Sequence, residues 1–252
     1  MLKIRQIDLI PIQDFPMVKT GDEISDLILS TLRKSGTELI QGDIIVVTHS
    51  IVSIAEGKLF RLDDVKVSER AARIAEKTGH NEERVEIALR EASEVLREEP
   101  VLITKTEHGI VTDFSGVDSS NAPPGSLVAL PDDPDRSAKR ISDTLSKSIG
   151  FNVPVIITDT QGRPWRKGAV NLAIGVAGMS PFIRNVGKED IYGYELKGSL
   201  VCLVDELASA TELVMGQAAE GVPAVIIRGV EFDDDKGSAN TIIRSDSENL
   251  FS

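Results

Sequence analysis

Residues 155–178, VIITDTQGRPWRKGAVNLAIGVAG, constrain the fold most strongly because they join two apolar stretches through a short polar turn. The first stretch, near residues 154–158, predicts a buried strand, since its apolar residues form an almost unbroken run. Residues 170–176 predict a second strand, and the glycine and proline between the two stretches predict a tight turn. The segment therefore indicates β-structure in the core.

The same segment carries an unusual set of polar groups. Asp159 and Thr160 follow the first strand, and we expect the Asp159 carboxylate to be exposed at the strand end. Three cations follow it: Arg163, Arg166 and Lys167. The whole chain is acidic, with 28 Lys and Arg residues against 40 Asp and Glu residues. This local positive charge is therefore opposite in sign to the net charge of the chain. Because carboxylates bind divalent cations and nearby cations bind phosphate or carboxylate, the segment indicates a metal-dependent enzyme that uses a nucleotide.

Composition argues against several other classes of protein. The chain has 252 residues, 41% of them hydrophobic, which suffices for a sizeable core in one large domain or two smaller ones. Its net charge of −12 argues against non-specific binding to nucleic acid or to an anionic membrane. No apolar run approaches the ~18 residues of a membrane span, and the N-terminus lacks the features of a signal peptide. We therefore expect a cytoplasmic protein, in which the single cysteine, Cys202, is a core thiol.

Apolar residues at helical spacing, with start and stop signals, predict the helices. Asp22, Asn81 and Asp133 are the expected N-caps, and Gly36 and Gly150 the expected C-terminal residues. The predicted helices cover residues 22–35, two segments of 68–98 separated at Gly79 (the second with an apolar stripe reaching Val95 and Leu96), residues 133–150 and residues 205–220.

Short apolar runs between these helices predict the strands. They lie within residues 2–12, 42–57 (a buried strand followed by a turn-rich continuation), 101–106, 109–114, 127–130, 154–158, 170–176, 199–204 and 223–229. Strands and helices mix without strict alternation, which favours an α+β fold over a doubly wound sheet.

The domain organisation is less strongly marked. Residues 1–230 form the main region, and the Pro/Gly/Asp-rich segment near 123–134 is the candidate junction between two subdomains. The acidic tail, 231–252, is expected to be weakly ordered, although Ile242 and Ile243 are able to dock.

No GxxxxGK[ST] or GxGxxG motif is present, so a nucleotide site must be built differently. A second acidic cluster, HGIVTDFSGVDSSN at 108–121, contains Asp118 and Asn121. Such residues often cap turns through their own backbone. The alternative is that Asp118 and Asp159, from distant segments, share Mg²⁺ or Mn²⁺ with nucleotide phosphates completing the coordination shell.

Several other polar or aromatic residues have a simpler explanation. Trp165 is expected to pack, although beside Arg166 it is also able to stack on a base or a flavin-like ring. His49 and His108 are expected to be hydrogen-bonded structural residues, because a total of three histidines argues against a zinc site based on histidine. A third group of charges is expected on a solvated helix face: Glu82, Glu83, Arg84 and Glu86.

Taken together, several segments resemble the coenzyme F420-0:L-glutamate ligase family. They keep their order over nearly the whole chain and cover residues 42–57, 68–79, 108–121, 157–168, 173–178 and 205–229. The resemblance implies an enzyme that uses GTP and divalent cations, Mg²⁺ or Mn²⁺ with K⁺ as a further candidate. It would attach L-glutamate through an amide to the lactyl-phosphate end of the F420 precursor, a deazaflavin. It also implies a two-domain α+β fold and an intertwined homodimer.

The resemblance also implies roles for particular residues. Asp118 and Asp159 would be the catalytic metal ligands, Thr160 would contact a second cation, and Gln217 would occupy a metal-facing position. Nucleotide contacts would come from Phe15, Pro16, Met17, Val18, His49, Ser50, Asn121, Met215, Gly216, Gln217, Ala218, Ala219, Glu220, Gly221 and Val222. To these we add an anion-binding role for Arg163, Arg166 and Lys167 on charge alone.

The chain departs from the family pattern at three places in the expected site. Ile54 stands where the family motif SKAEG has lysine, FSGVD replaces NAGVD, and Gln217 is a neutral amide where an acid would be a stronger ligand. These differences leave open a protein that binds a nucleotide or deazaflavin without turnover, or one with a different substrate. The paired acids alone also fit a metal-dependent phosphohydrolase.

Overall fold

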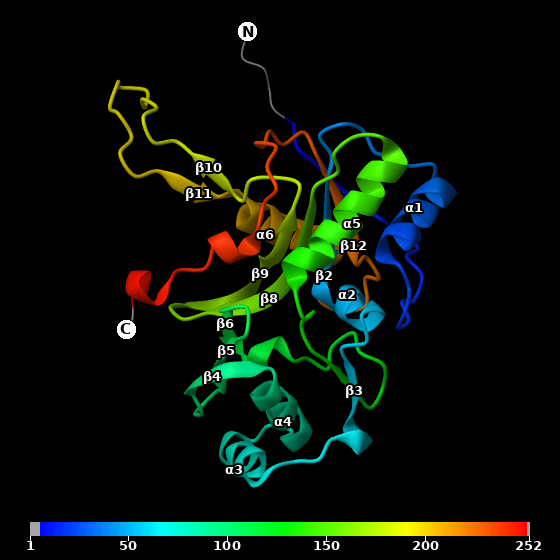
Figure 1. The fold of residues 1–252 in the computed structure, drawn as a ribbon, viewed down its shortest axis with the longest axis vertical. Helices are drawn as coiled ribbons and strands as arrows, with labels where there is room; N and C mark the ends of the chain where they lie inside the picture. Colours follow the sequence, from blue (N-terminus) through cyan, green and yellow to red (C-terminus); the bar gives the residue numbers. More distant parts are fainter. Residues whose placement is uncertain (1–5, 251–252) are drawn as a thin grey trace.

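A five-stranded mixed sheet forms the centre of the protein, a computed structural model of which describes residues 6–250 (Figure 1). Its strand order is β1-β12-β2-β8-β9, and only β2 and β8 are parallel to each other. The strands are β1 (Asp8–Pro11), β12 (Ala224–Arg228), β2 (Ile44–Thr48), β8 (Val155–Arg163) and β9 (Arg166–Ala177).

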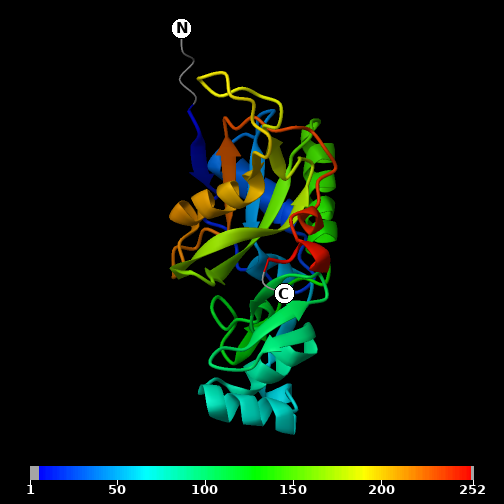
Figure 2. The same ribbon diagram turned by 90° about the vertical axis from the view of Figure 1, so that its left-hand side faces the viewer.

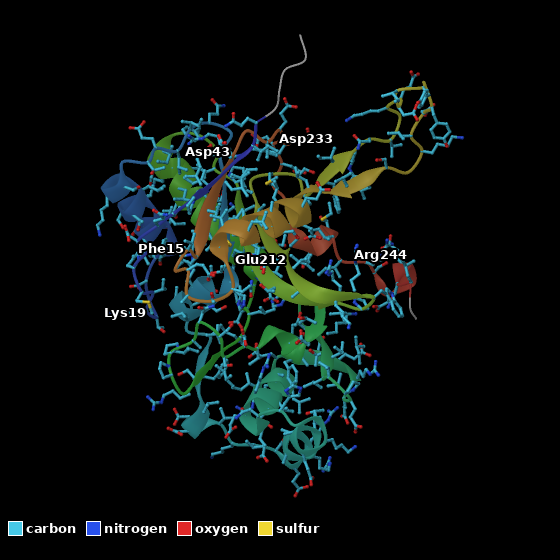
Figure 3. All side chains as sticks on the ribbon, turned by 180° about the vertical axis from the view of Figure 1, so that it is seen from behind. Phe15, Lys19, Asp43, Glu212, Asp233 and Arg244 are labelled. Carbon is cyan, nitrogen blue, oxygen red and sulfur yellow. The ribbon has the colours of Figure 1, made fainter. Side chains whose placement is uncertain are left out.

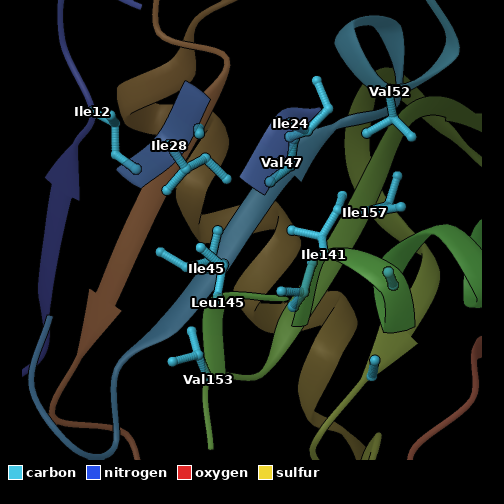
Figure 4. Packing of buried hydrophobic residues seen from close by; sticks show 14 of the residues in the cluster. Ile12, Ile24, Ile28, Ile45, Val47, Val52, Ile141, Leu145, Val153 and Ile157 are labelled. Atoms are coloured by element: carbon cyan, nitrogen blue, oxygen red, sulfur yellow. The ribbon is translucent and has the colours of Figure 1, made fainter. Parts of the chain in front are cut away.

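Helices cover both faces of this sheet, and alternating side chains of each strand meet them. Ile45 and Val47 of β2 belong to the hydrophobic cluster under α1 (Ile24–Ser35) and α5 (Pro134–Ile149), as Figure 4 shows. Ile44 and Val46 face the opposite cluster, which includes residues of α6 (Leu203–Met215). Consecutive apolar residues are what burial on both faces requires, and residues 44–47 of β2, the central strand, and 155–157 of β8 beside it have this pattern.

Residues 59–128 form a smaller lobe below the central sheet, with a third hydrophobic cluster (Figures 1 and 2). It is joined to β2 by α2 (His49–Ala55). The lobe contains β3 (Leu59–Arg61), η1 (Leu62–Asp64), α3 (Glu69–Thr78), α4 (Glu82–Arg90), β4 (Ala92–Arg97), β5 (Ile103–Thr106), β6 (Val111–Asp113), η2 (Phe114–Gly116) and β7 (Ser126–Val128).

Two further segments leave the central body. The antiparallel pair β10 (Phe182–Arg184) and β11 (Leu200–Cys202) carries an arm that projects from the molecule (Figure 1). The C-terminal segment returns over the sheet through η3 (Ala239–Thr241) and η4 (Asp246–Glu248). Ile242 packs against the cluster that includes α6, so the expected docking of this side chain is confirmed.

Several local expectations are confirmed by the backbone. Gly36 and Gly150 end their helices in the left-handed region, and the side chains of Asn81 and Asp133 accept hydrogen bonds from helix N–H groups. These signals act within one turn of chain, so the sequence alone is enough to reveal them. The Cys202 thiol is half-buried, and burial raises its pKa to about 12, which fits an unreactive thiol.

Other expectations about the type and the bounds of helices and strands were wrong, because contacts with distant segments determine them. Residues 92–97 form β4 instead of extending the preceding helix, because they pair with β5. The segment after β2 is the helix α2 instead of a turn-rich stretch, and α6 covers 203–215 instead of 205–220. Asp22 does not cap α1, since its carboxylate accepts a hydrogen bond from Lys19 N.

The hairpin of β8 and β9 is longer than the strands predicted from the apolar residues, 154–158 and 170–176. Its strands continue through the polar residues to a turn at residues 164–165, because β9 supplies backbone partners as far as Arg166. Asp159 therefore lies in the middle of β8 instead of at a strand end. Trp165, expected to pack, is 79% exposed at the turn.

Candidate functional site

A polar cavity of about 260 Å³ lies where the central sheet meets the smaller lobe. Asp118 and Asp159, 41 positions apart in the sequence, both line it. The parallel pairing of β2 and β8 sets Thr48 opposite Thr158, so His49 and Asp159 follow side by side at the point where β2 ends and β8 continues. Further lining residues discussed below include Ser50, Arg84, Asp113, Asn121, Thr160, Asn171, Met215, Gly216 and Gln217.

Asp159 is buried, at 8% exposure, so the prediction of an exposed carboxylate was wrong. Its Oδ1 lies 3.3 Å from Nε2 of His49, and its Oδ2 accepts a hydrogen bond of 3.3 Å from Nε2 of Gln161. Burial raises the pKa of Asp159, the nearby Asp113 charge raises it further, and the contacts with His49 and Gln161 only partly oppose that shift. The carboxylate is thus held in a fixed direction at the cavity wall.

Asp118 reaches the cavity from a turn that is tied to β7. Its backbone exchanges two hydrogen bonds of 2.9 Å with Val128. Burial disfavours the charged form, but hydrogen bonds donated by Ser120 and Ser119 and the charge of Arg84 outweigh it, so the pKa of Asp118 is lowered. This carboxylate is therefore ionised at neutral pH.

The turn before Asp118 depends on a glycine. Gly116 has a φ of 70°, and a Cβ there would lie 2.7 Å from Cγ of Leu130. Any larger residue would push the turn away from Leu130, and the position of Asp118 would change with it.

Thr160 belongs to a hydrogen-bond network that connects β8, β9 and the end of α6. Its hydroxyl donates to Asn171 Oδ1 at 2.6 Å and accepts from Gln217 Nε2 at 2.9 Å. Asn171 N in turn donates to Glu212 Oε2 at 2.8 Å, and Figure 3 shows Glu212 on α6 above the hairpin. The network fixes the segment of residues 215–217 against the cavity.

The donor set can be tested against the divalent cation that the sequence indicated. Within residues 6–250, no group of three or more His, Cys, Asp and Glu side chains is arranged to hold a metal by itself. Two carboxylates and a hydroxyl are nevertheless the hard oxygen donors that Mg²⁺ and Mn²⁺ use when water and substrate phosphates supply the other ligands. The residues fit a cation that binds together with its substrate.

Not all predicted site residues reach the cavity. Arg163, Arg166 and Lys167 lie at the hairpin turn and do not line it, although Arg163 Nη2 donates to Lys167 O at 3.1 Å. Phe15 and Val18 pack against the cluster under α1, while Met17 is 88% exposed.

Other residues of the predicted nucleotide-binding segments 15–18 and 215–222 also lie outside the cavity lining. Figure 3 shows Phe15 and Lys19 beside α1, and Pro16 belongs to the same loop. Of the 215–222 segment, only the first three residues line the cavity. The residues outside the lining are Ala218, Ala219, Glu220, Gly221 and Val222, and their nucleotide contacts stay predictions.

Two charged residues that line the cavity were not assigned to the site from the sequence. Arg84, expected on a solvated helix face, lines the cavity because α4 packs against η2. Glu86, expected on the same face, is buried at 8% exposure. Asp113 ends β6 at the cavity wall. An acid at the end of a short strand was an available signal for Asp113, whereas nothing local marked Arg84.

Comparisons with known proteins identify the family of this chain. The family described as F420-0:Gamma-glutamyl ligase matches residues 13–229. A protein of Methanothermobacter thermautotrophicus, named coenzyme F420:L-glutamate ligase, is 48% identical over 224 residues, covering 88% of this chain and 89% of its own length. Proteins of the same name from Methanopyrus kandleri and Archaeoglobus fulgidus are 46% and 38% identical, covering 93% and 97% of this chain and 93% and 96% of their own lengths.

These similarities extend over nearly the whole chain. The protein is therefore an enzyme of the ligase class. It belongs to the F420-0:gamma-glutamyl ligase family, and the resemblance that its motifs indicated is confirmed.

Proposed function

We propose that this enzyme joins L-glutamate to the coenzyme F420 precursor through an amide bond, using GTP and a divalent cation. The names of its relatives support the acceptor and the amino acid. The convergence of Asp118 and Asp159 on one polar cavity supports a cation bound with an anionic substrate, and this is the single observation that carries the site assignment.

The reaction has two steps. The acceptor carboxylate attacks the γ-phosphorus of GTP, so that a carboxylate–phosphorus bond forms and the bond to GDP breaks. The amine of glutamate then attacks the acyl phosphate, losing a proton as the amide forms and inorganic phosphate leaves. When bound, a divalent cation would supply positive charge that offsets the negative charge of the phosphates.

The residues of the chain bind and orient the reactants. Asp118, ionised at neutral pH, and Asp159 would hold the cation, and Thr160 would contact a second cation. Asn121 and Ser50 offer an amide and a hydroxyl to the nucleotide at the same wall. No side chain acts as a covalent nucleophile in this scheme, because positioning and charge neutralisation supply most of the acceleration in phosphoryl transfer.

We further propose that the enzyme acts as a cytoplasmic homodimer. The arm between β10 and β11 exposes large apolar side chains, with Ile191 at 92% and Tyr192 at 90% exposure. Contiguous exposed apolar surface is typical of protein–protein contacts. In the described part of the chain, no helix is long and apolar enough to cross a membrane.

The alternative of a binding protein without turnover rests on two residues that depart from the family pattern, Ile54 and Gln217. Gln217 presents its amide nitrogen, which is not a metal ligand, to the Thr160 hydroxyl. If the site is degenerate, Ile54→Lys combined with Gln217→Glu raises turnover greatly. A wild-type protein that already turns over many times per minute excludes this alternative.

The proposed function is tested by incubating purified protein with GTP, Mn²⁺, L-glutamate and the F420 precursor. We expect mass spectrometry to show a glutamylated product and one GDP and one phosphate for each amide formed. Absence of both product and phosphate would contradict the proposal. Phosphate release that does not depend on glutamate would instead favour the phosphohydrolase.

A further inference from the structure

Arg84 is a cation at the cavity wall, whereas the other charged residues near the start of α4, Glu82, Glu83 and Glu86, do not line the cavity. It lies in the first turn of α4, and its half-buried side chain reaches the cavity beside Asp118. Among the described lining residues it is the only lysine or arginine. The cations of the hairpin turn are not part of this wall, so they do not supply positive charge there.

The guanidinium is fixed in place by two contacts. Its carbon lies 4.4 Å from the centroid of the Phe114 ring, and its Nε donates a hydrogen bond of 2.8 Å to Val117 O. Within residues 6–250 this is the only hydrogen bond of the group, whereas a guanidinium has five N–H donors. The contacts orient the group and leave donors for a ligand.

The charge balance of the cavity requires positive charge when an anion binds. Asp113, Asp118 and Asp159 all line it. A nucleotide with several negative charges would be repelled by these three carboxylates without compensation. A divalent cation offsets part of this repulsion, and Arg84 stands on the Asp118 side, where its charge helps to lower the pKa of that carboxyl group.

The size of the cavity indicates which part of a ligand enters. Its volume of about 260 Å³ is below the ~300–1,000 Å³ typical of sites that enclose a whole ligand. Hydroxyl, amide and carboxylate groups dominate its lining, which suits a phosphate chain better than a purine base. The planar guanidinium is able to bind two phosphate oxygens at once.

From these observations we propose that Arg84 binds the polyphosphate chain of the nucleotide and holds it against Asp118. This inference rests on the proposed use of GTP and assigns a substrate contact to a residue outside the motifs of the family. Phe114 orients the guanidinium and does not itself contact the nucleotide.

The test is calorimetric binding of GTP and of inorganic tripolyphosphate, each with Mn²⁺, to the intact protein. We expect Arg84→Gln to weaken both by about 10- to 100-fold, the range of a charge-assisted hydrogen bond. Arg84→Lys should recover part of the affinity, because it keeps the charge and loses the two-pronged geometry. Arg73→Gln, an exposed change on α3, is the matched control and should bind like the wild type.

The outcomes separate the inference from the proposed function. If wild-type protein binds both ligands and Arg84→Gln binds them equally well with a lowered melting temperature, Arg84 is only structural and the inference is overturned. If Arg84→Gln raises the KM of glutamate alone, the anion is the amino acid and the inference is also overturned. Failure of wild-type protein to bind either ligand overturns the use of GTP together with the inference.

Discussion

The imidazole Nε2 of His49 lies 3.3 Å from Oδ1 of Asp159, just beyond the paired residues Thr48 and Thr158 of the parallel strands β2 and β8. This contact partly offsets the cost of burying the charged carboxylate, so it opposes the rise in the pKa of Asp159 that burial causes. His49 Nδ1 lies 3.4 Å from Ser53 Oγ in the first turns of α2. The imidazole thus connects Asp159 to α2 and fixes the direction in which its carboxylate points.

Removal of His49 should weaken cation binding through Asp159. We expect His49→Ala to lower the affinity for Mn²⁺ in the presence of GTP by about 10- to 100-fold, the usual effect of losing a residue that orients a metal ligand. Titration of free Mn²⁺ by electron paramagnetic resonance measures this. In a double-mutant cycle with Asp159→Asn, the two effects should be strongly non-additive; additive effects would show that His49 does not act through Asp159.

The two carboxylates should be needed for activity and dispensable for folding. Asp118→Asn and Asp159→Asn should each reduce kcat/KM by about 100-fold or more, because each removes charge that binds the cation. Steady-state product formation measures the loss, and circular dichroism checks the fold. Asp143→Asn, an exposed partner of Lys139, is the control. Near-normal activity of either site variant would exclude a shared cation site.

The buried Glu86 should make the stability of the smaller lobe depend on pH. Burial opposes its charged form, but hydrogen bonds from Ser68 and Arg90 outweigh burial, and the pKa of Glu86 is lowered from its ordinary value of 4.5. The group therefore stabilises the fold above the unfolded-state pKa, and this contribution is lost as the pH falls through the lower folded-state pKa.

Substitution isolates this contribution. Glu86→Gln should lower the free energy of unfolding by about 1–2 kcal/mol at pH 7. Urea unfolding at several pH values should show the difference shrinking below about pH 4. Glu76→Gln, an exposed change on α3, should have no such pH dependence. A difference between Glu86→Gln and wild type that persists unchanged at pH 3 would contradict the assignment.

Gly216 should tolerate no side chain, because its φ is 70° and its ψ is −177°. A Cβ there would also lie 2.2 Å from the carboxyl carbon of Glu220. Gly216→Ala should cost about 1–3 kcal/mol and weaken nucleotide binding through displacement of Gln217. Gly198→Ala, where a Cβ meets open space, should stay within about 0.5 kcal/mol of wild type in thermal unfolding. Equal melting temperatures for the two variants would disprove the strain argument.

Much of the fold could be predicted from the sequence because its signals are local. Helix caps such as Asn81 and Asp133, and apolar runs such as 44–47, depend on a few neighbouring residues. The β4 strand could not be predicted, because its residues have helical apolar spacing and become a strand only through pairing with β5. The polar half of the β8–β9 hairpin was also missed, because its residues become strands only through pairing with each other.

In the candidate site, too, local motifs revealed some residues, and tertiary packing determined the others. Asp118 and Asp159 were selected from motifs, and the strand register explains why Asp159 and His49 meet. The burial of Asp159 and the position of Arg84 depend on how the smaller lobe packs against the hairpin, which no short segment encodes. Charge alone suggested Arg163 as a binder, but the length of the hairpin carries it outside the cavity lining.

The central claim is that Asp118 and Asp159 hold one cation together with the nucleotide. Anomalous diffraction from a crystal containing Mn²⁺ and GTP tests this most directly. We predict an anomalous peak about 2.0–2.3 Å from a carboxylate oxygen of each residue, with phosphate oxygens completing the coordination. Manganese bound elsewhere while the two carboxylates contact only protein and water would contradict the account.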